Sequence, residues 1–156
     1  MIEIYVMRHG QAEVHAAADH LRKLTEHGER EVTEMCTRID ALSSLPHIIC
    51  SPYVRARQTA EIVAEQSSAA LHVYEGITPE AIPSAAIDFV YNYCEQQAIS
   101  RLLIVSHMPF VASFVEMLAG AERGRHAMPT ASVAFLSGDV VAKNCCELHW
   151  IKSPQS

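Results

Sequence analysis

Two histidines and two arginines stand at or shortly after the ends of apolar runs of the sequence, where their side chains could bind a phosphate group. Arg8 and His9 end the N-terminal apolar run, His107 ends the run at 102–105, and Arg55 comes shortly after the run at 47–50. The planar guanidinium fork binds two oxygens of a phosphate and stays charged, and an imidazolium donates to the same group. Two imidazoles and two guanidiniums brought to one place therefore predict a phosphate pocket.

Each of these residues has an ordinary alternative when it is taken alone. Arg8 could extend from a strand end into solvent, His9 could be a hydrogen-bonded core histidine, and His107 could begin a turn. The arginines after residue 52 could lie on a solvated helix face, and we favour this for Arg57, which has Glu61 four residues later. Because polar residues of this kind follow all three apolar runs, we favour a functional role over these separate alternatives.

The apolar runs that carry these residues predict a layered α/β fold. We expect strands at 2–7, 47–50, 71–74, 102–105, 132–136 and 147–151, and helices at about 25–42, 53–65, from Ser84 onward and 109–120. In the third helix Ser84 would be the cap, and Ile87, Val90, Tyr91 and Cys94 would form the buried face.

Alternating strands and helices indicate a three-layer αβα sandwich with a mainly parallel sheet, and the last two strands would pair as an antiparallel hairpin around 137–139. Ligands bind beyond the carboxyl ends of such strands, where helix N-termini favour anions. All three polar segments fall at that edge.

Composition narrows the class of protein further. The 156 residues suffice for one domain, 1–156, and the net charge of −6 argues against a general nucleic-acid or acidic-membrane binder. Arg8 and His9 interrupt the first apolar run too early for a membrane span, and no signal peptide is indicated. Five cysteines without CxxC spacing favour reduced thiols and a cytoplasmic location.

Three quoted segments together resemble a known family. "MRHGQAE", "CSPYVRARQTAEIVAE" and "IVSHMPFVASFVEMLAG" are similar to the signature segments of the histidine phosphatase (phosphoglycerate mutase-like) superfamily. The chain length, "RKLTEHG" and "SHMP" resemble its SixA-type phosphohistidine phosphatase branch. The resemblance implies a phosphoglycerate mutase-like fold and a metal-independent phosphatase.

The resemblance also assigns roles to individual residues. His9 would be the nucleophile that becomes phosphorylated, within a pocket formed by Arg8, Arg55 and His107. Arg22 matches an arginine near the pocket in this branch, although Lys23 stands where relatives usually carry proline. For this chemistry His9 must be neutral, whereas His107 would be useful when protonated.

Further residues concern proton transfer and phosphate binding. The Gln11 amide could donate to phosphate. Related phosphoester enzymes use a carboxylate after the third strand, so Glu75 or Glu80 is a candidate general acid, although a surface position is preferred for both. No metal or other cofactor is expected, because the guanidiniums supply the positive charge and the remaining histidines lack ligand spacing.

The substrate and partner follow from the resemblance and from the short chain. We expect a phosphohistidine on a protein, such as a histidine phosphotransfer domain, because 79–84 and 120–129 are the only candidate pocket walls and both are short. Two alternatives stay open. One is a phosphatase for small phosphomonoesters, and the other is a non-catalytic phosphate-binding adaptor.

Overall fold

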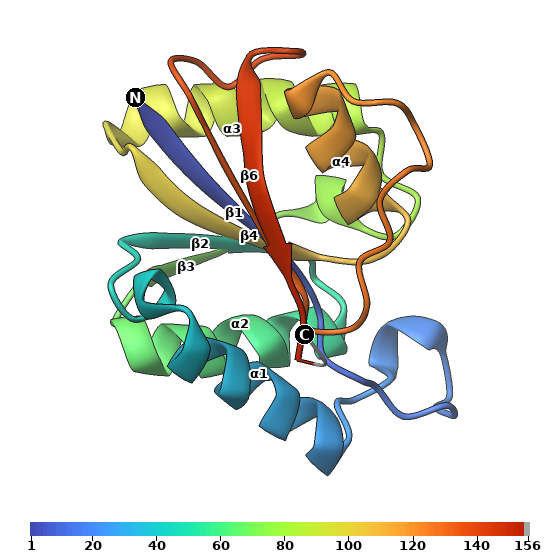
Figure 1. The fold of residues 1–156 in the computed structure, drawn as a ribbon. Coiled ribbons are helices and arrows are strands. Elements are labelled where there is room, and N and C mark those ends of the chain that lie inside the picture. The colour runs from blue at the N-terminus through green and yellow to red at the C-terminus, as the bar shows by residue number, and fades with distance from the viewer. Residues whose placement is uncertain (155–156) are drawn as a thin grey trace.

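The computed structural model describes residues 1–154 and is built around a six-stranded sheet (Figure 1). Its strands are β1 (Ile2–Arg8), β2 (His47–Cys50), β3 (Ala70–Val73), β4 (Arg101–Ser106), β5 (Val133–Gly138) and β6 (Cys146–Lys152). In the order β3-β2-β4-β1-β5-β6, the first four strands are parallel, while β5 and β6 are antiparallel to their neighbours. The predicted mainly parallel sheet with an antiparallel edge is confirmed.

Helices cover both faces of this sheet. They are α1 (Glu26–Arg38), α2 (Val54–Ser67), α3 (Pro83–Gln97) and α4 (Phe110–Ala119), with short 3-10 turns η1 (Asp19–Leu21), η2 (Asp40–Ser43) and η3 (Glu75–Ile77). In Figure 1, α1 and α2 lie below the sheet and α3 and α4 lie above it. The three-layer αβα architecture is therefore confirmed.

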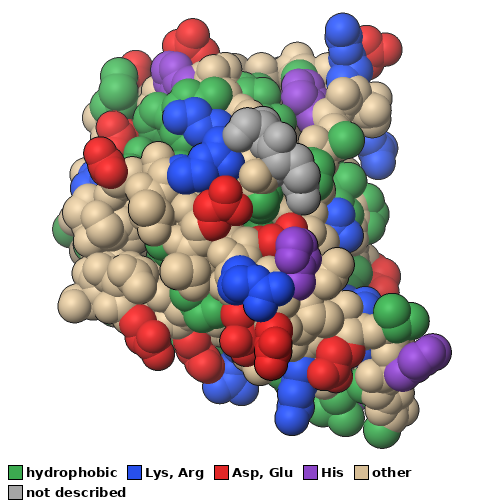
Figure 2. Space-filling view, turned by 60° about the horizontal axis from the view of Figure 1, so that its bottom comes forward, with side chains coloured by type: hydrophobic (Ala, Val, Ile, Leu, Met, Phe, Trp, Pro, Cys, Tyr) green, Lys and Arg blue, Asp and Glu red, His purple; other side chains and the backbone are tan. Residues whose placement is uncertain are grey.

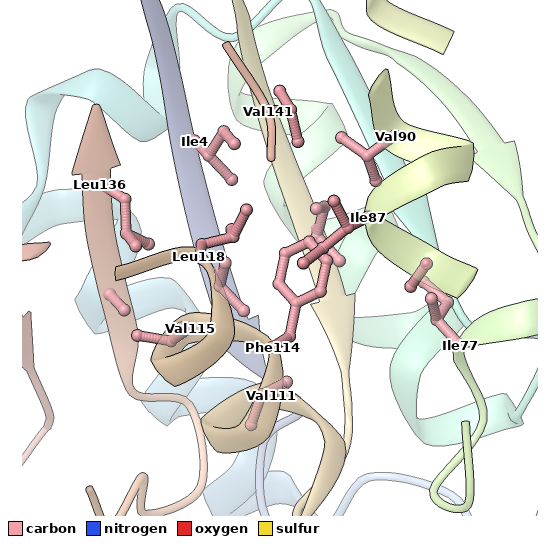
Figure 3. Close-up of a cluster of buried hydrophobic side chains, with 14 of the residues drawn as sticks. Ile4, Ile77, Ile87, Val90, Val111, Phe114, Val115, Leu118, Leu136 and Val141 are labelled. Carbon is pink, nitrogen blue, oxygen red and sulfur yellow. The ribbon is translucent and has the colours of Figure 1, made fainter. Parts of the chain in front are cut away.

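The central strands are buried on both faces because helices cover both sides of the sheet. Successive side chains of a strand therefore point into different cores. In β1, Ile4 and Val6 pack in the core that includes α3 and α4, whereas Tyr5 and Met7 pack in the core that includes α1 and α2. Figure 3 shows the first core, with Phe114 of α4 among its side chains. A continuous apolar run is the sequence pattern that such a doubly covered strand requires.

Several helix boundaries differ from those expected. The helix expected to reach Leu42 ends at Arg38, and Leu42 is buried from the following 3-10 turn instead. Ser84 is not a cap, because α3 already begins at Pro83, whose fixed φ suits the first helical position. Tyr91 was expected in the core but is 39% exposed. The buried face of α3 is thus narrower than the sequence pattern predicted.

The C-terminal strand pair has a longer connection than expected. β5 and β6 pair in antiparallel register, but residues 139–145 separate them instead of a tight turn at 137–139. Pairing itself was predictable from two amphipathic runs close together in sequence, whereas the loop length was not.

The surface is consistent with the acidic net charge. Figure 2 shows Lys and Arg side chains interspersed with Asp and Glu on the face that comes forward from below. This face therefore does not present the continuous positively charged surface that is typical of nucleic-acid binding. Among residues 1–154, none of the helices combines the length and the apolar character needed to cross a bilayer.

Two glycines bring the end of β1 against the start of α1. A Cβ on Gly28 would lie 2.0 Å from the carbonyl oxygen of Gln11, and one on Gly10 would lie 2.7 Å from the carbonyl oxygen of Gly28. Thr25 caps α1 by accepting from the Gly28 N–H at 2.9 Å, and its hydroxyl donates to Gln11 Oε1 at 2.8 Å. Close backbone approach thus holds the segment that follows His9.

Substitution of Gly28 should therefore destabilise the fold. We expect Gly28→Ala to lower the free energy of unfolding by about 2–3 kcal/mol, because the added methyl group overlaps backbone that cannot move freely. Glu34→Ala, on the exposed face of the same helix, should change it by less than about 0.5 kcal/mol. Urea unfolding measures both. A Gly28→Ala protein as stable as Glu34→Ala would contradict this packing.

Candidate active site

A cleft of about 350 Å3 opens at the carboxyl ends of β1 and β4. Its lining residues are Arg8, His9, Gln11, Ala12, Asp19, Arg22, Arg55, Pro79, His107, Met108 and Thr130. The structure thus brings together Arg8, His9, Arg55 and His107, as the sequence predicted, and Arg22 and Gln11 join them. His9 and His107, which are 98 positions apart in the chain, meet here because parallel β1 and β4 are hydrogen-bonded neighbours.

The His9 ring has a defined orientation and tautomer. Its side chain is 6% exposed, and Nδ1 lies 2.7 Å from the Gly10 carbonyl oxygen. Because a carbonyl oxygen can only accept, Nδ1 carries the proton and Nε2 keeps its lone pair. Arg55 Nε donates to that lone pair at 3.2 Å. Nε2 is therefore the nitrogen available for attack, and a guanidinium already lies beside it.

The backbone around His9 is held from several elements. Its N–H donates to the Ser106 carbonyl at the end of β4, and its own carbonyl accepts from the Ala131 N–H, at 3.0 and 2.9 Å. The Gly10 N–H donates to Thr59 Oγ1 of α2 at 3.1 Å. The ring position is thus set by contacts with the sheet, the loop before β5 and α2.

His107 lies beside His9 at the end of β4. The two ring centroids are 5.1 Å apart, and His107 is 1% exposed. Its Nε2 is 2.7 Å from Ser51 Oγ, and the Tyr53 ring packs against it with centroids 4.9 Å apart. The two imidazoles are therefore close enough to contact one tetrahedral phosphoryl group.

Two buried nitrogens in this site have no hydrogen-bond partner. Within residues 1–154, Arg8 Nε and His107 Nδ1 are the two buried side-chain polar atoms for which the structure shows none. Leaving a buried donor unpaired is costly, and such groups concentrate at functional sites. Their coincidence in one cleft is independent support for this cleft as the active site.

The arginines converge from three segments. Arg8 donates to the Met128 carbonyl at 3.1 Å, and Arg55 donates to the Asp19 carbonyl and to Asp19 Oδ2 at 2.8 and 3.2 Å. Arg22 donates to Asp19 Oδ1 and to the Glu13 carbonyl, both at 2.9 Å. Three guanidiniums thus lie around one small cleft, which is an arrangement suited to a phosphate or another multiply charged oxyanion.

Both imidazoles are neutral at physiological pH. Burial is the main cause that lowers the pKa of His9 to about 4; the hydrogen bond to Gly10 opposes this shift, and the charge of Arg55 adds to it. Burial likewise lowers the pKa of His107 to about 2, with the nearby His9 ring as a further cause. The expected neutral His9 agrees with this electrostatic environment, whereas the protein alone does not hold His107 in the charged form expected from the sequence.

The other predicted residues lie at varied distances from the chemistry. Gln11 lines the cleft, but its Oε1 accepts from Thr25, which leaves the amide NH2 as the donor available to a phosphate. Glu75 and Glu80 are exposed on and after η3 and do not line the cleft, where Pro79 takes that side. Arg57 forms the expected exposed pair with Glu61, at 4.0 Å.

Sequence reasoning missed three residues that shape the cleft. Asp19 bridges two arginines, Ser51 pairs with His107, and Glu31 of α1 is 3% exposed. Glu31 accepts from the Gln11 N–H at 2.9 Å and from Thr130 Oγ1 at 3.2 Å, so it joins two cleft-lining segments. An acidic residue three positions before Arg22 was the available signal for Asp19, but a loop has no periodicity that would place its side chain.

The described part of the chain offers no set of side chains that could bind a metal ion. Within residues 1–154, no three His, Cys, Asp or Glu side chains are grouped so that they could hold a metal ion. The positive charge in the cleft comes from guanidinium groups.

A larger hollow of about 500 Å3 lies over α4 and is lined in part by Ile82, Met117 and Lys143. Among the described residues that line it there is no imidazole, so it cannot supply the histidine pair found in the smaller cleft. Size alone therefore does not identify the active site, and the smaller cleft carries the chemistry.

Comparisons with known proteins identify the family of this chain. The family description "Histidine phosphatase superfamily (branch 1)" matches residues 4–79. The phosphohistidine phosphatase SixA homolog of Haemophilus influenzae is 33% identical over 150 residues, covering 88% of this chain and 89% of that protein. Phosphohistidine phosphatase SixA of Escherichia coli is 30% identical over 125 residues, covering 78% and 76%.

A solved structure of the protein histidine phosphatase SixA complexed with tungstate matches with a TM-score of 0.88 and 25% identity, over 99% of this chain and 98% of that one. The chain therefore belongs to the histidine phosphatase superfamily and to its SixA-type branch. This confirms the resemblance carried by the three segments and the phosphatase class that it implied.

The positions of Glu75 and Glu80 lead to a test of both as general acids. We expect Glu75→Gln and Glu80→Gln to change kcat/KM for a phosphohistidine substrate by less than about twofold, because neither side chain lines the cleft. Steady-state release of inorganic phosphate measures this. A loss of about 100-fold in either variant, as expected for removal of a general acid, would contradict the geometry.

Proposed function

We propose that this chain is a protein phosphohistidine phosphatase that works through a phosphorylated His9. The observation that carries the proposal is the unprotonated Nε2 of His9, which accepts a hydrogen bond from Arg55 Nε at 3.2 Å and lies beside the ring of His107. A neutral imidazole with one unprotonated nitrogen and a cation next to it has the two properties that phosphoryl transfer requires, a nucleophile and preorganised positive charge.

The reaction would take place in two transfers. Arg8, Arg55 and Arg22 bind the phosphoryl oxygens of the substrate, and His9 Nε2 attacks phosphorus while the substrate nitrogen leaves. Water then attacks phosphohistidine-9 and releases inorganic phosphate. The bound phosphoryl group is negatively charged, so it raises the pKa of the adjacent His107 and allows that ring to donate a hydrogen bond to it. Metal ions have no step in this mechanism.

The leaving group favours phosphohistidine over an alkyl phosphate ester. An alkoxide needs a proton from a general acid, whereas imidazole departs as a neutral molecule when its second nitrogen is protonated. The two candidate acids, Glu75 and Glu80, are not among the residues that line the cleft. This supports a phosphoramidate substrate and makes a small phosphomonoester the weaker alternative.

The intended partner in this proposal is a histidine phosphotransfer domain or another phosphohistidine protein. The relatives named above are phosphohistidine phosphatases, which supports a phosphohistidine protein as the substrate. The cleft has a longer wall than the sequence predicted, because the connection between β1 and α1 also lines it through Asp19 and Arg22. All five cysteines are free thiols, which supports action in the reducing cytoplasm. One domain over 1–156 and independence of cofactors remain predictions within the same proposal.

Direct detection of phosphohistidine-9 tests the mechanism. We expect wild-type protein mixed with a 32P-phosphorylated histidine phosphotransfer domain to carry label after a quench in alkaline detergent, which preserves the P–N bond. His9→Ala should carry none, because the attacking nitrogen is gone.

The control for this experiment is His149→Ala, which removes an exposed imidazole on β6. It should carry the same label as wild type. Label of equal intensity on His9→Ala, or its absence from wild type during turnover, would exclude the covalent route. Absence of both label and phosphate release from wild type would instead support the non-catalytic adaptor alternative.

A further inference from the structure

Asp19 occupies an unusual position at the outer end of the cleft. Its carboxylate bridges two guanidiniums, with Oδ1 2.9 Å from Arg22 Nε and Oδ2 3.2 Å from Arg55 NH2. Its side chain is 59% exposed, whereas that of Arg55 is 4% exposed. A carboxylate has about four acceptor positions, so positions remain on the solvent side after these two contacts. Asp19 is thus a cleft-lining anion that remains open to solvent.

The chemistry of phosphohistidine creates a need for such an acceptor. One ring nitrogen carries the phosphoryl group, and the other can carry a proton. If that proton is present, the ring leaves as neutral imidazole; if it is absent, the ring must leave as an imidazolate anion, which is a far poorer leaving group. An enzyme for this substrate therefore gains by holding the proton on the far nitrogen.

We propose that Asp19 accepts a hydrogen bond from the N–H of the departing imidazole and so selects phosphohistidine over phosphate esters. The inference rests on the proposed function and names a specificity-determining residue for it. As His9 Nε2 bonds to phosphorus, the P–N bond of the substrate breaks and its electron pair stays on the departing nitrogen. The far nitrogen keeps its proton throughout, and neutral imidazole leaves.

The same carboxylate is unsuited to act as a general acid. Partial burial by itself raises the pKa of Asp19, but the hydrogen bonds and charges of Arg22 and Arg55 outweigh this and lower the pKa. At neutral pH Asp19 has no proton to give to a departing alkoxide. It therefore assists a leaving group that brings its own proton and offers nothing to one that needs a proton, which is the basis of the selectivity.

A purely structural role makes a different prediction. Asp19 also positions Arg55 through its carbonyl and its carboxylate, at 2.8 and 3.2 Å. If that were its whole contribution, its removal would impair every substrate whose phosphoryl group Arg55 binds, whatever the leaving group. Two substrates that differ in the leaving group therefore separate the two roles.

The experiment compares N-phosphorylimidazole with p-nitrophenyl phosphate, whose nitrophenolate leaves without a proton and has no N–H. For Asp19→Ala we expect kcat/KM to fall about 10–100-fold with N-phosphorylimidazole, as for loss of a charged hydrogen bond, and less than about threefold with p-nitrophenyl phosphate. Asp19→Asn keeps an uncharged acceptor, so its loss with N-phosphorylimidazole should be smaller than that of Asp19→Ala.

The control is Glu13→Gln, which removes a carboxylate of the same loop that does not line the cleft. It should leave both substrates within about twofold of wild type. Equal losses on the two substrates in Asp19→Ala, or no loss on either, would overturn the proposed role of Asp19. These results would leave the proposed function unaffected. A wild-type protein that hydrolyses p-nitrophenyl phosphate but neither N-phosphorylimidazole nor a phosphorylated phosphotransfer domain would overturn the proposed function, and this inference with it.

Discussion

The hydrogen bond from His9 Nδ1 to the Gly10 carbonyl is the interaction on which the active site depends. It fixes the tautomer, and by doing so it leaves Nε2 as a nucleophile directed toward Arg55. The Gly10 backbone is in turn held in place, since its N–H donates to Thr59 Oγ1 and a Cβ at this position would lie 2.7 Å from the Gly28 carbonyl oxygen. A catalytic property of one ring thus depends on close backbone packing between β1, α1 and α2.

The electrostatics of the cleft follow from the burial of its two imidazoles and from the cations that surround them. Burial and the neighbouring guanidiniums both disfavour protonation of His9, which keeps it nucleophilic at neutral pH. Two carboxylates limit the repulsion among the arginines: Asp19 at the outer end, and buried Glu31, whose charge opposes the lowering of the Arg8 pKa. Arg8 Nε and His107 Nδ1 nevertheless stay without partners. A phosphoryl group supplies the negative charge and the acceptor atoms that such a cluster lacks.

Much of this arrangement could be predicted from the sequence, and the exceptions have physical reasons. Strand ends are marked by a change from apolar to polar residues, so the sequence alone places Arg8, His9 and His107 at one edge of the sheet. Helix boundaries were less predictable, because Pro83 and not Ser84 begins α3. The contribution of Asp19 could not be foreseen, since it depends on how an aperiodic loop folds back onto α2. Loops carry much of the specificity and the least sequence pattern.

The most direct test of the account is 15N NMR of the His9 imidazole across a pH series. At pH 7 we predict a proton on Nδ1 and none on Nε2. Because the pKa is lowered to about 4, the ring should stay neutral as the pH falls through 6 and 5 and become charged only near 4. A proton on Nε2 at neutral pH, or a titration near the ordinary histidine value of about 6.5, would contradict the account.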